Sequence, residues 1–362
     1  MNPSRPLNSN NHTKPVMFRM NKSEDFAKFY TFLETNKQIY VYDTIEEQIQ
    51  ELIKIQNPSE QFSEEDLKSG VASYLDGMPA KDFGVWVYYP WSNRLVHLLP
   101  EKEFSEVRTS RNIFKITPEE RNILSSKAIG VIGMSVGSSI ALTMAVERIF
   151  GEIRIADFDS LELSNLNRVR TGVHNLGLKK TIVTAREISE IDPFLKVTCM
   201  HDAVNENNLK SFLLSPSKLD VLVEECDSMD VKLLARQVAR SFKIPVVMET
   251  NDRGLLDIER FDLEPNRPVL HGLIEESEIY KLKDMSMAEK AVFVKKILGY
   301  DNLSERGKYS MSRVGKEITS WPQLASAVAL GSGIATDVCR RILLDQLKVS
   351  GRFYIDLESI VC

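Results

Sequence analysis

The stretch AIGVIGMSVGSSIALTMAVERIF, residues 128–150, decides the fold. It joins two apolar runs through the loop GMSVGSS (133–139), a pattern that predicts a strand, a glycine turn and a helix. This arrangement places backbone N–H groups and the positive end of a helix dipole where an anion can bind. The loop has Gly133 and Gly137 but lacks the third glycine of a G-x-G-x-x-G pattern. By itself the loop is compatible with a dinucleotide site, with another phosphate site and with a plain turn.

Strand and helix patterns alternate after this loop. Apolar strand patterns lie at 152–157, 194–200, 219–225 and 244–250, and helical patterns separate them. Such alternation predicts an α/β fold with a doubly wound, mostly parallel sheet, in which ligands bind at the carboxyl ends of the strands. The stretch 254–265 predicts a hairpin or an antiparallel pair, which begins a C-terminal antiparallel extension. Further predicted elements are helices over 138–149, 179–190, 229–241 and 324–347, and a last strand over 351–357.

The chain divides into three regions by its patterns. Residues 1–20 are polar and predict a disordered tail. Residues 21–107 predict a small N-terminal α/β module in which no residue pattern suggests chemistry. Residues 108–362 hold the alternating pattern, interrupted by a charged crossover segment at 273–320.

The composition narrows the class of protein. The 362 residues carry a net charge of −5, whereas a general nucleic-acid binder usually shows a basic balance. No apolar run reaches the ~18 residues expected of a membrane span, and the polar N-terminus lacks the core of a signal peptide. We therefore expect a cytoplasmic protein that binds neither nucleic acid nor membrane. The four cysteines are far apart in sequence, which predicts free thiols and no zinc ribbon.

Polar residues follow the predicted strands at the points where ligands bind. Ser135, Ser138 and Ser139 add hydroxyl donors to the loop. Asp157 ends the second strand, 24 residues past Gly133, where an acidic residue of a dinucleotide-binding domain contacts ribose hydroxyls. These features alone would fit a nicotinamide-dependent oxidoreductase.

Three further clusters are not explained by hydride transfer. Asn165, Asn167 and Arg168 place amides and a cation beside the loop. GLKKT (177–181) opens a helix with two lysines, which are either solvated or face an anion. VEECDSMD (223–230) ends the fourth strand with carboxylates that either hold Mg²⁺ or, at Asp227 or Ser228, only cap the next helix. Together these groups favour ATP chemistry at the α- or γ-phosphate.

The segment DFDSLELSNLNR (157–168) resembles the D-x-D-x-V-x-x-S-N-L-x-R signature of the ThiF/MoeB/HesA family, bacterial relatives of ubiquitin-activating enzymes. The resemblance covers roughly 108–357 and implies a Rossmann-like fold and ATP-dependent adenylation of a carboxylate. The acids of its D-x-D fall on Asp157, the ribose ligand, and on Asp159.

The resemblance also implies roles for residues around the nucleotide. The phosphate-contacting residues fall on Asn165 and Arg168, the lysine on Lys180, and the Mg²⁺-linked acid on Asp227. Arg111, in RTSRN, matches an arginine that reaches the partner's ATP across a homodimer.

The chain departs from the family pattern in several places. Its phosphate loop is one residue shorter, RPVLHG (267–272) stands where many members carry a zinc C-x-x-C, and the crossover segment has no cysteine. We therefore expect no zinc and no thiol transfer from that segment. The segments SVGSSIA and VEECDSMDVK resemble a MoeY-like subset, in which a nitroreductase-like flavin domain follows, so a longer parent chain is expected.

The leading hypothesis from the sequence is a homodimeric, Mg²⁺-dependent adenylyltransferase. Its acyl substrate is open: the C-terminus of a ubiquitin-like carrier, a peptide or a small acid. The alternatives are a catalytically reduced module that binds a nucleotide or a partner, motivated by the shortened loop, and a nicotinamide-dependent oxidoreductase.

Overall fold

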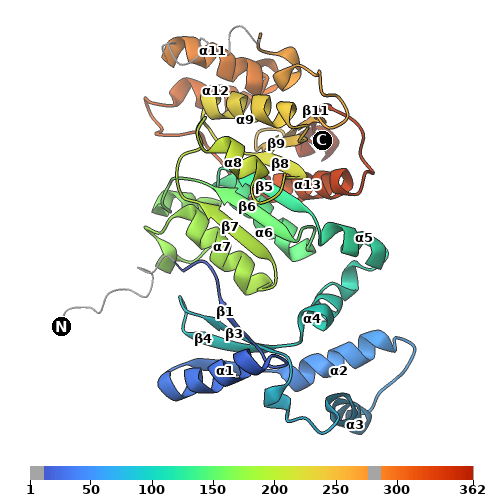
Figure 1. Ribbon diagram of the computed structural model, residues 1–362. Helices are drawn as coiled ribbons and strands as arrows, with labels where there is room; N and C mark the ends of the chain where they lie inside the picture. Colours follow the sequence, from blue (N-terminus) through green and yellow to red (C-terminus); the bar gives the residue numbers. More distant parts are fainter. Residues whose placement is uncertain (1–11, 276–286, 362) are drawn as a thin grey trace, which may run out of the picture. The chain divides into compact units, whose positions relative to one another are not determined.

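The structure is a computed structural model that describes residues 12–275 and 287–361. The chain forms two compact units, residues 1–118 and 119–362 (Figure 1). In the described part of the chain, no helix has the length and apolar character needed to cross a membrane.

The first unit is built on a small mixed sheet. Its strands lie in the order β1-β3-β4-β2, with β2 parallel to β4 and the other pairs antiparallel. The aromatic rings of Phe18, Phe29 and Trp86 pack together in its core. The elements are β1 (Val16–Arg19), α1 (Ser23–Thr35), β2 (Tyr40–Asp43), α2 (Ile45–Gln56), α3 (Glu64–Leu75), η2 (Ala80–Asp82), β3 (Val85–Tyr89), β4 (Arg94–Leu98), α4 (Glu101–Arg108) and η3 (Ser110–Asn112).

The predicted tail is too long at its C-terminal end. Residues 16–19 form strand β1, which pairs with β3. The sequence before this strand is polar, but Phe18 is 5% exposed and its ring lies 5.2 Å from that of Phe32. Burial of this side chain stabilises a strand that composition alone assigned to the tail.

The second unit holds a seven-stranded sheet in the order β11-β10-β9-β8-β5-β6-β7. Strands β5 to β9 pair in parallel, and β10 pairs antiparallel with both β9 and β11. The predicted α/β fold, its mostly parallel sheet and its antiparallel extension are therefore confirmed. The strands are β5 (Ala128–Ile132), β6 (Glu152–Ala156), β7 (Lys196–Met200), β8 (Val221–Glu224), β9 (Val246–Thr250), β10 (Leu255–Glu259) and β11 (Gly351–Tyr354).

Helices cover this sheet. Helix α6 packs against α7 and α13, and α8 packs against α9 over a core that includes Ile132, Phe212 and Ala235. Within the predicted crossover segment, residues 276–286 lie outside the described residues, and α11 and α12 follow. The helices are α5 (Pro118–Leu124), α6 (Val136–Glu147), α7 (Lys180–Ile191), α8 (Leu209–Leu214), α9 (Met229–Ser241), α11 (Met287–Leu298), α12 (Glu305–Arg313), α13 (Ala325–Leu343) and α14 (Leu357–Val361), with short turns η4 (Leu163–Asn167), η5 (Val173–Asn175), η6 (Val269–Gly272) and η8 (Tyr300–Asn302).

The order of the strands positions the site. From β5 the chain adds β6 and β7 on one side and β8 and β9 on the other. The carboxyl ends of β5 and β8 therefore flank the point where the winding reverses, which is where open α/β sheets bind ligands.

Candidate phosphate-binding site

The glycine loop lies directly against the segment after β8. Gly133 has φ +91°, and a Cβ added to it would lie 2.7 Å from the carbonyl carbon and oxygen of Glu225. A Cβ added to Gly137 would lie 2.8 Å from Val131 Cγ1. Only glycine fits both the turn and the close approach of helix α6 to strand β5. The N-cap of α6, Ser135, makes no side-chain cap, so the backbone amides of the first turn have no capping side chain.

Asp157 ties the loop to the end of β6. Its Oδ2 accepts a hydrogen bond from Met134 N at 2.6 Å, and its Oδ1 accepts one from Asp159 N at 2.7 Å. The carboxylate predicted to bind ribose therefore also fixes the glycine loop. The sequence reasoning missed this second role, because a pattern of spacings does not show which backbone amides a carboxylate meets.

Arg168 lies at the amino end of helix α6. Its Nε donates to Ser135 Oγ at 3.1 Å, and one of its terminal nitrogens donates to Asn167 Oδ1 at 2.8 Å. Burial lowers the pKa of Arg168, and the charge of Asp227 acts in the opposite direction. The structure thus joins the predicted cation to the loop serine, and the charge of the predicted metal-binding acid acts on that cation.

The other loop residues have mainly local contacts. Asn165 is 8% exposed, and its Oδ1 accepts from Glu162 N at 3.0 Å, which closes the turn η4. Ser138 Oγ donates to Ser135 O at 3.0 Å. In this structure both side chains support the loop geometry, and their contact with a nucleotide stays a prediction.

Lys180 is buried at the start of α7 and pairs with Asp159. Its Nζ lies 2.8 Å from Asp159 Oδ2, and Lys180 is 7% exposed. The neighbouring Lys179 donates from its Nζ to Phe158 O. Both lysines at this helix start therefore contact the loop that follows β6, and Lys180 is the one that is buried and paired with a carboxylate.

Asp227 follows β8 and is exposed, whereas its neighbour caps the next helix. Ser228 Oγ accepts from Val231 N at 3.5 Å at the start of α9. Of the two capping candidates, Ser228 has this role. Within residues 12–275 and 287–361, no cluster of three or more His, Cys, Asp or Glu side chains suits a metal. Mg²⁺ often binds proteins through one or two carboxylates plus substrate phosphates, and Asp227 fits that mode.

Two further residues, one predicted and one next to the predicted acid, stand apart from these contacts. Arg111 lies in η3 of the first unit, and its role at a nucleotide site stays a prediction. Cys226 lies beside Asp227, but burial raises the pKa of its thiol, and its Sγ contacts Glu224 Oε1 at 2.7 Å. A thiol with a raised pKa is a poor nucleophile near neutral pH, which supports a packing role.

A buried pair of carboxyl groups lies behind the glycine loop. Glu249 N donates to Glu225 Oε1 at 2.9 Å. Both carboxylate oxygens of Glu249 are buried and meet no hydrogen-bond partner among the described residues, and a Cβ added to Gly331 of α13 would lie 2.1 Å from Glu249 Cδ. Burial raises the pKa of Glu249 to about 8, and burial together with the charge of Glu249 raises the pKa of Glu225.

This pair predicts an unusual dependence of stability on pH. Between pH 4.5 and about 8 the native state keeps the proton of Glu249 that the unfolded state releases. The native state then binds more protons, so the free energy of unfolding falls as pH rises through this window. We expect Glu249→Gln to flatten the profile and to raise the free energy of unfolding above pH 8 by roughly 2–4 kcal/mol. Urea denaturation between pH 5 and 9 measures this.

The control for this prediction is Glu305→Gln. Glu305 is an exposed residue of α12 whose side chain contacts Lys308. We expect this variant to keep the wild-type profile. Parallel profiles for the wild type and Glu249→Gln would contradict the assignment of the raised pKa.

The fold and the site together define the class of protein: a doubly wound α/β domain with an arginine, a lysine and uncapped helix amides around one glycine loop. Residues 109–254 match the ThiF family. The chain is also similar to PaaA, whose crystal structure aligns with a TM-score of 0.51 and 17% identity over 87% of this chain and 97% of that one. That likeness concerns the fold alone.

Two curated relatives extend the comparison. The chain is 42% identical over 274 residues to the uncharacterized protein MT1398 of Mycobacterium tuberculosis (strain CDC 1551 / Oshkosh), covering 76% of this chain and 38% of that protein. It is 22% identical over 165 residues to the molybdopterin-synthase adenylyltransferase of Haemophilus influenzae (strain ATCC 51907 / DSM 11121 / KW20 / Rd), covering 45% of this chain and 64% of that protein. The chain thus spans less than two thirds of the length of either relative.

Proposed function

We propose that the second unit, residues 119–362, binds ATP and adenylates a carboxylate. The observation that carries the proposal is the contact of Arg168 with Ser135 at the uncapped start of α6. The ThiF family match over 109–254 and the similarity to a named adenylyltransferase support the same chemistry.

The proposed reaction is attack of a carboxylate oxygen on the α-phosphorus of ATP. The bond from that phosphorus to the bridging oxygen breaks, and pyrophosphate leaves with the electron pair. Charge grows on the phosphoryl oxygens, so the chain's contribution is to hold fixed cations and N–H groups around them. The first turn of α6 binds phosphate through its amides, and Arg168 and Lys180 stabilise the growing negative charge. Asp227 would hold Mg²⁺, which supplies further neutralisation of phosphate charge when bound.

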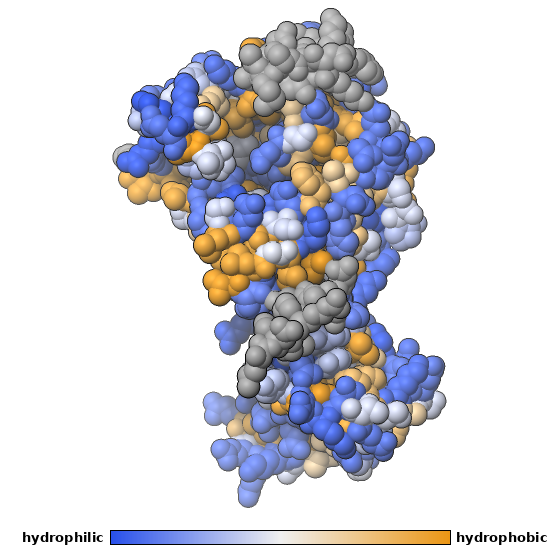
Figure 2. All heavy atoms as spheres, turned by 90° about the vertical axis from the view of Figure 1, so that its left-hand side faces the viewer, coloured by the Kyte–Doolittle hydropathy of each residue, from blue (hydrophilic) through white to orange (hydrophobic). Residues whose placement is uncertain are grey.

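The proposal includes a homodimer in which Arg111 contributes to the partner's site. Exposed apolar side chains follow β6 in the loops around the candidate site, and Figure 2 shows that apolar groups gather in a patch on one face of the second unit. The exposed residues of these loops are Phe158, Leu163, Val173 and Leu176. Contiguous exposed apolar surface often marks a protein interface.

The test of the proposed function is exchange of labelled pyrophosphate into ATP in the presence of Mg²⁺. We expect exchange that depends on an added carboxylate and is lost in Lys180→Ala. The absence of exchange with every carboxylate tried, together with no heat on titration with ATP, would contradict the proposal.

A second candidate function is a module of a larger flavin-linked system that binds a nucleotide or a partner without turnover. The same assay distinguishes this function from adenylation. Two observations motivate it: the loop is one residue shorter than the family's, and Lys180 already pairs with Asp159. Binding of ATP without exchange, and without any effect of Arg111→Ala, would favour this function.

A further inference from the structure

Asn167 joins the segment that carries Arg168 to a part of the chain 156 positions away. Its Nδ2 donates a hydrogen bond to Gln323 O at 2.8 Å, and its Oδ1 accepts one from Arg168 Nη1 at 2.8 Å. The signature in this segment leaves the position of Asn167 open, and the proposed function gives the residue no role. A side chain at an open position thus bonds both to the proposed phosphate-binding arginine and to a distant main-chain carbonyl.

The two partners of Asn167 fix the orientation of its amide. An arginine side chain can only donate hydrogen bonds, and a main-chain carbonyl can only accept them. The carbonyl oxygen of the amide must therefore face Arg168, and its NH₂ group must face Gln323. Among side chains of this length only asparagine serves both partners, because aspartate has no donor and leucine has no polar atom.

The guanidinium of Arg168 is held from two sides. Its Nε donates to Ser135 Oγ at 3.1 Å in the glycine loop, and its Nη1 donates to Asn167. Among the described residues its Nη2 has no hydrogen-bond partner, so this nitrogen is available to a phosphate oxygen. A long side chain loses rotamer entropy when it is fixed, and contacts that fix it before ATP binds lower the cost of binding.

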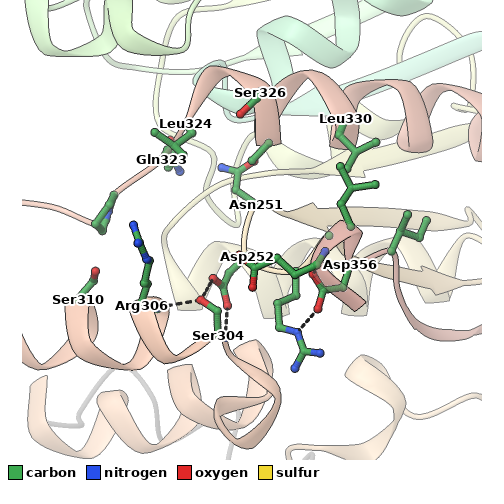
Figure 3. Close-up of a pocket in the computed structure, with 18 of the residues that line it drawn as sticks. Asn251, Asp252, Ser304, Arg306, Ser310, Gln323, Leu324, Ser326, Leu330 and Asp356 are labelled. Carbon is green, nitrogen blue, oxygen red and sulfur yellow. Dashed lines mark hydrogen bonds and ion pairs between the residues drawn. The ribbon is translucent and has the colours of Figure 1, made fainter. Parts of the chain in front are cut away.

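Gln323 belongs to the segment through which the chain returns from the crossover to α13, residues 304–324, here called the return limb. Figure 3 shows Gln323 where the return limb enters α13. The beginning of the limb is fixed separately, because Ser304 N and Oγ donate to the two carboxylate oxygens of Asp252 at 2.8 and 2.6 Å (Figure 3). Residues 308–324 are all exposed or half-buried. Packing therefore holds this part of the limb weakly, and the hydrogen bond from Asn167 matters more.

We propose that Asn167 is a positioning residue that couples the docking of the return limb to the direction of the Arg168 guanidinium. The docked limb holds the amide, and the amide holds the arginine toward the phosphates. Displacement of the limb releases both. The assignment rests on the proposed function, because it concerns the arginine that stabilises charge on the phosphates. In this assignment Asn167 contacts neither ATP nor the carboxylate and acts only through Arg168.

Hydrogen–deuterium exchange of the full chain without nucleotide tests the contact with the return limb. We expect the peptide that covers residues 314–324 to exchange faster by about 3- to 10-fold in Asn167→Ala. Asn167→Asp should give the same increase, because aspartate keeps an acceptor for Arg168 but loses the donor to Gln323. Unchanged exchange in both variants would overturn the assignment.

Asn36→Ala is the control for this measurement. Asn36 Nδ2 makes a hydrogen bond of the same kind, to Phe32 O at 2.9 Å, in the first unit. Its loss should leave the exchange of residues 314–324 as in the wild type. Equal acceleration in Asn36→Ala would show a general loosening of the protein and would overturn the specific role of Asn167.

A double-variant cycle in the pyrophosphate-exchange assay tests the coupling to Arg168. We expect Asn167→Ala to lower kcat by on the order of tenfold and to leave the KM for the carboxylate unchanged. In the Arg168→Gln background the same change should have no further effect, because no guanidinium is left to position. A merely structural role would instead give equal losses in both backgrounds, and that result would overturn the assignment.

The same cycle can be measured by calorimetric titration with ATP and Mg²⁺, as ratios of Kd, in a protein that binds without turnover. If the wild type shows neither exchange nor ATP binding, the proposed function fails and this assignment fails with it. If ATP binds and only the cycle or the deuterium exchange fails, the role of Asn167 alone is overturned.

Discussion

Gly133→Ala is expected to destabilise the protein by about 2–5 kcal/mol and to abolish nucleotide binding. The residue has φ +91°, which alanine rarely adopts, and the new Cβ would lie 2.7 Å from backbone atoms of Glu225. The three atoms nearest to this Cβ all belong to the backbone of Glu225 and Cys226, so no flexible side chain can move away to make room. The cost therefore combines conformational strain with displacement of the segment that carries Asp227. Urea denaturation measures the change in the free energy of unfolding.

Gly333→Ala is the matched control for this substitution. Gly333 lies within helix α13, and a Cβ added to it meets no atom within 4 Å. Alanine is the better helix former, so this variant should be more stable than the wild type by about 0.5–1 kcal/mol. Equal free energies of unfolding for the two variants would contradict the close contact between the glycine loop and the segment after β8.

Arg168→Gln is expected to lower the rate of adenylation by about 10²–10³-fold and to leave the fold intact. The guanidinium contacts Ser135 and Asn167 on the surface of the loop, and its charge faces the place proposed for the phosphates. Glutamine keeps hydrogen-bonding capacity but has no charge to stabilise the departing pyrophosphate. Pyrophosphate exchange under saturating ATP measures the rate, and thermal denaturation checks the fold.

Arg170→Gln serves as the comparison for this charge. Arg170 is an exposed arginine two residues further along the chain, and no hydrogen bond or ion pair joins it to another described residue. We expect this variant to retain wild-type exchange. Equal losses in the two variants would indicate a general effect of surface charge and would count against a specific role for Arg168.

The sheet and much of the site could be predicted because their signals are local. Period-2 and period-3.6 patterns place β5 to β9 and their helices, and the parallel arrangement brings Gly133, Asp157 and Asp227 to one edge of the sheet. The signature DFDSLELSNLNR then directs attention to Arg168. The structure adds the 3.1 Å contact from Arg168 to Ser135, which joins two of these patterns.

The remaining features depend on contacts between distant parts of the chain. Glu249 looks like one more polar residue at a strand end, and only its packing against Gly331 and Glu225 shows that it is buried without a counter-charge. The hydrogen bond from Asn167 to Gln323 joins residues 156 positions apart in sequence. No spacing rule relates such residues, because the path of the chain between them sets their distance.

The claim that the loop at 133–139 binds the phosphates of ATP is tested most directly by calorimetric titration of the full chain with ATP and Mg²⁺, and separately with NADH. The account predicts saturable binding of ATP that is weakened by on the order of tenfold or more in Arg168→Gln, and no comparable binding of NADH. Tight binding of NADH with no response to ATP would contradict the account and would instead support a nicotinamide-dependent oxidoreductase.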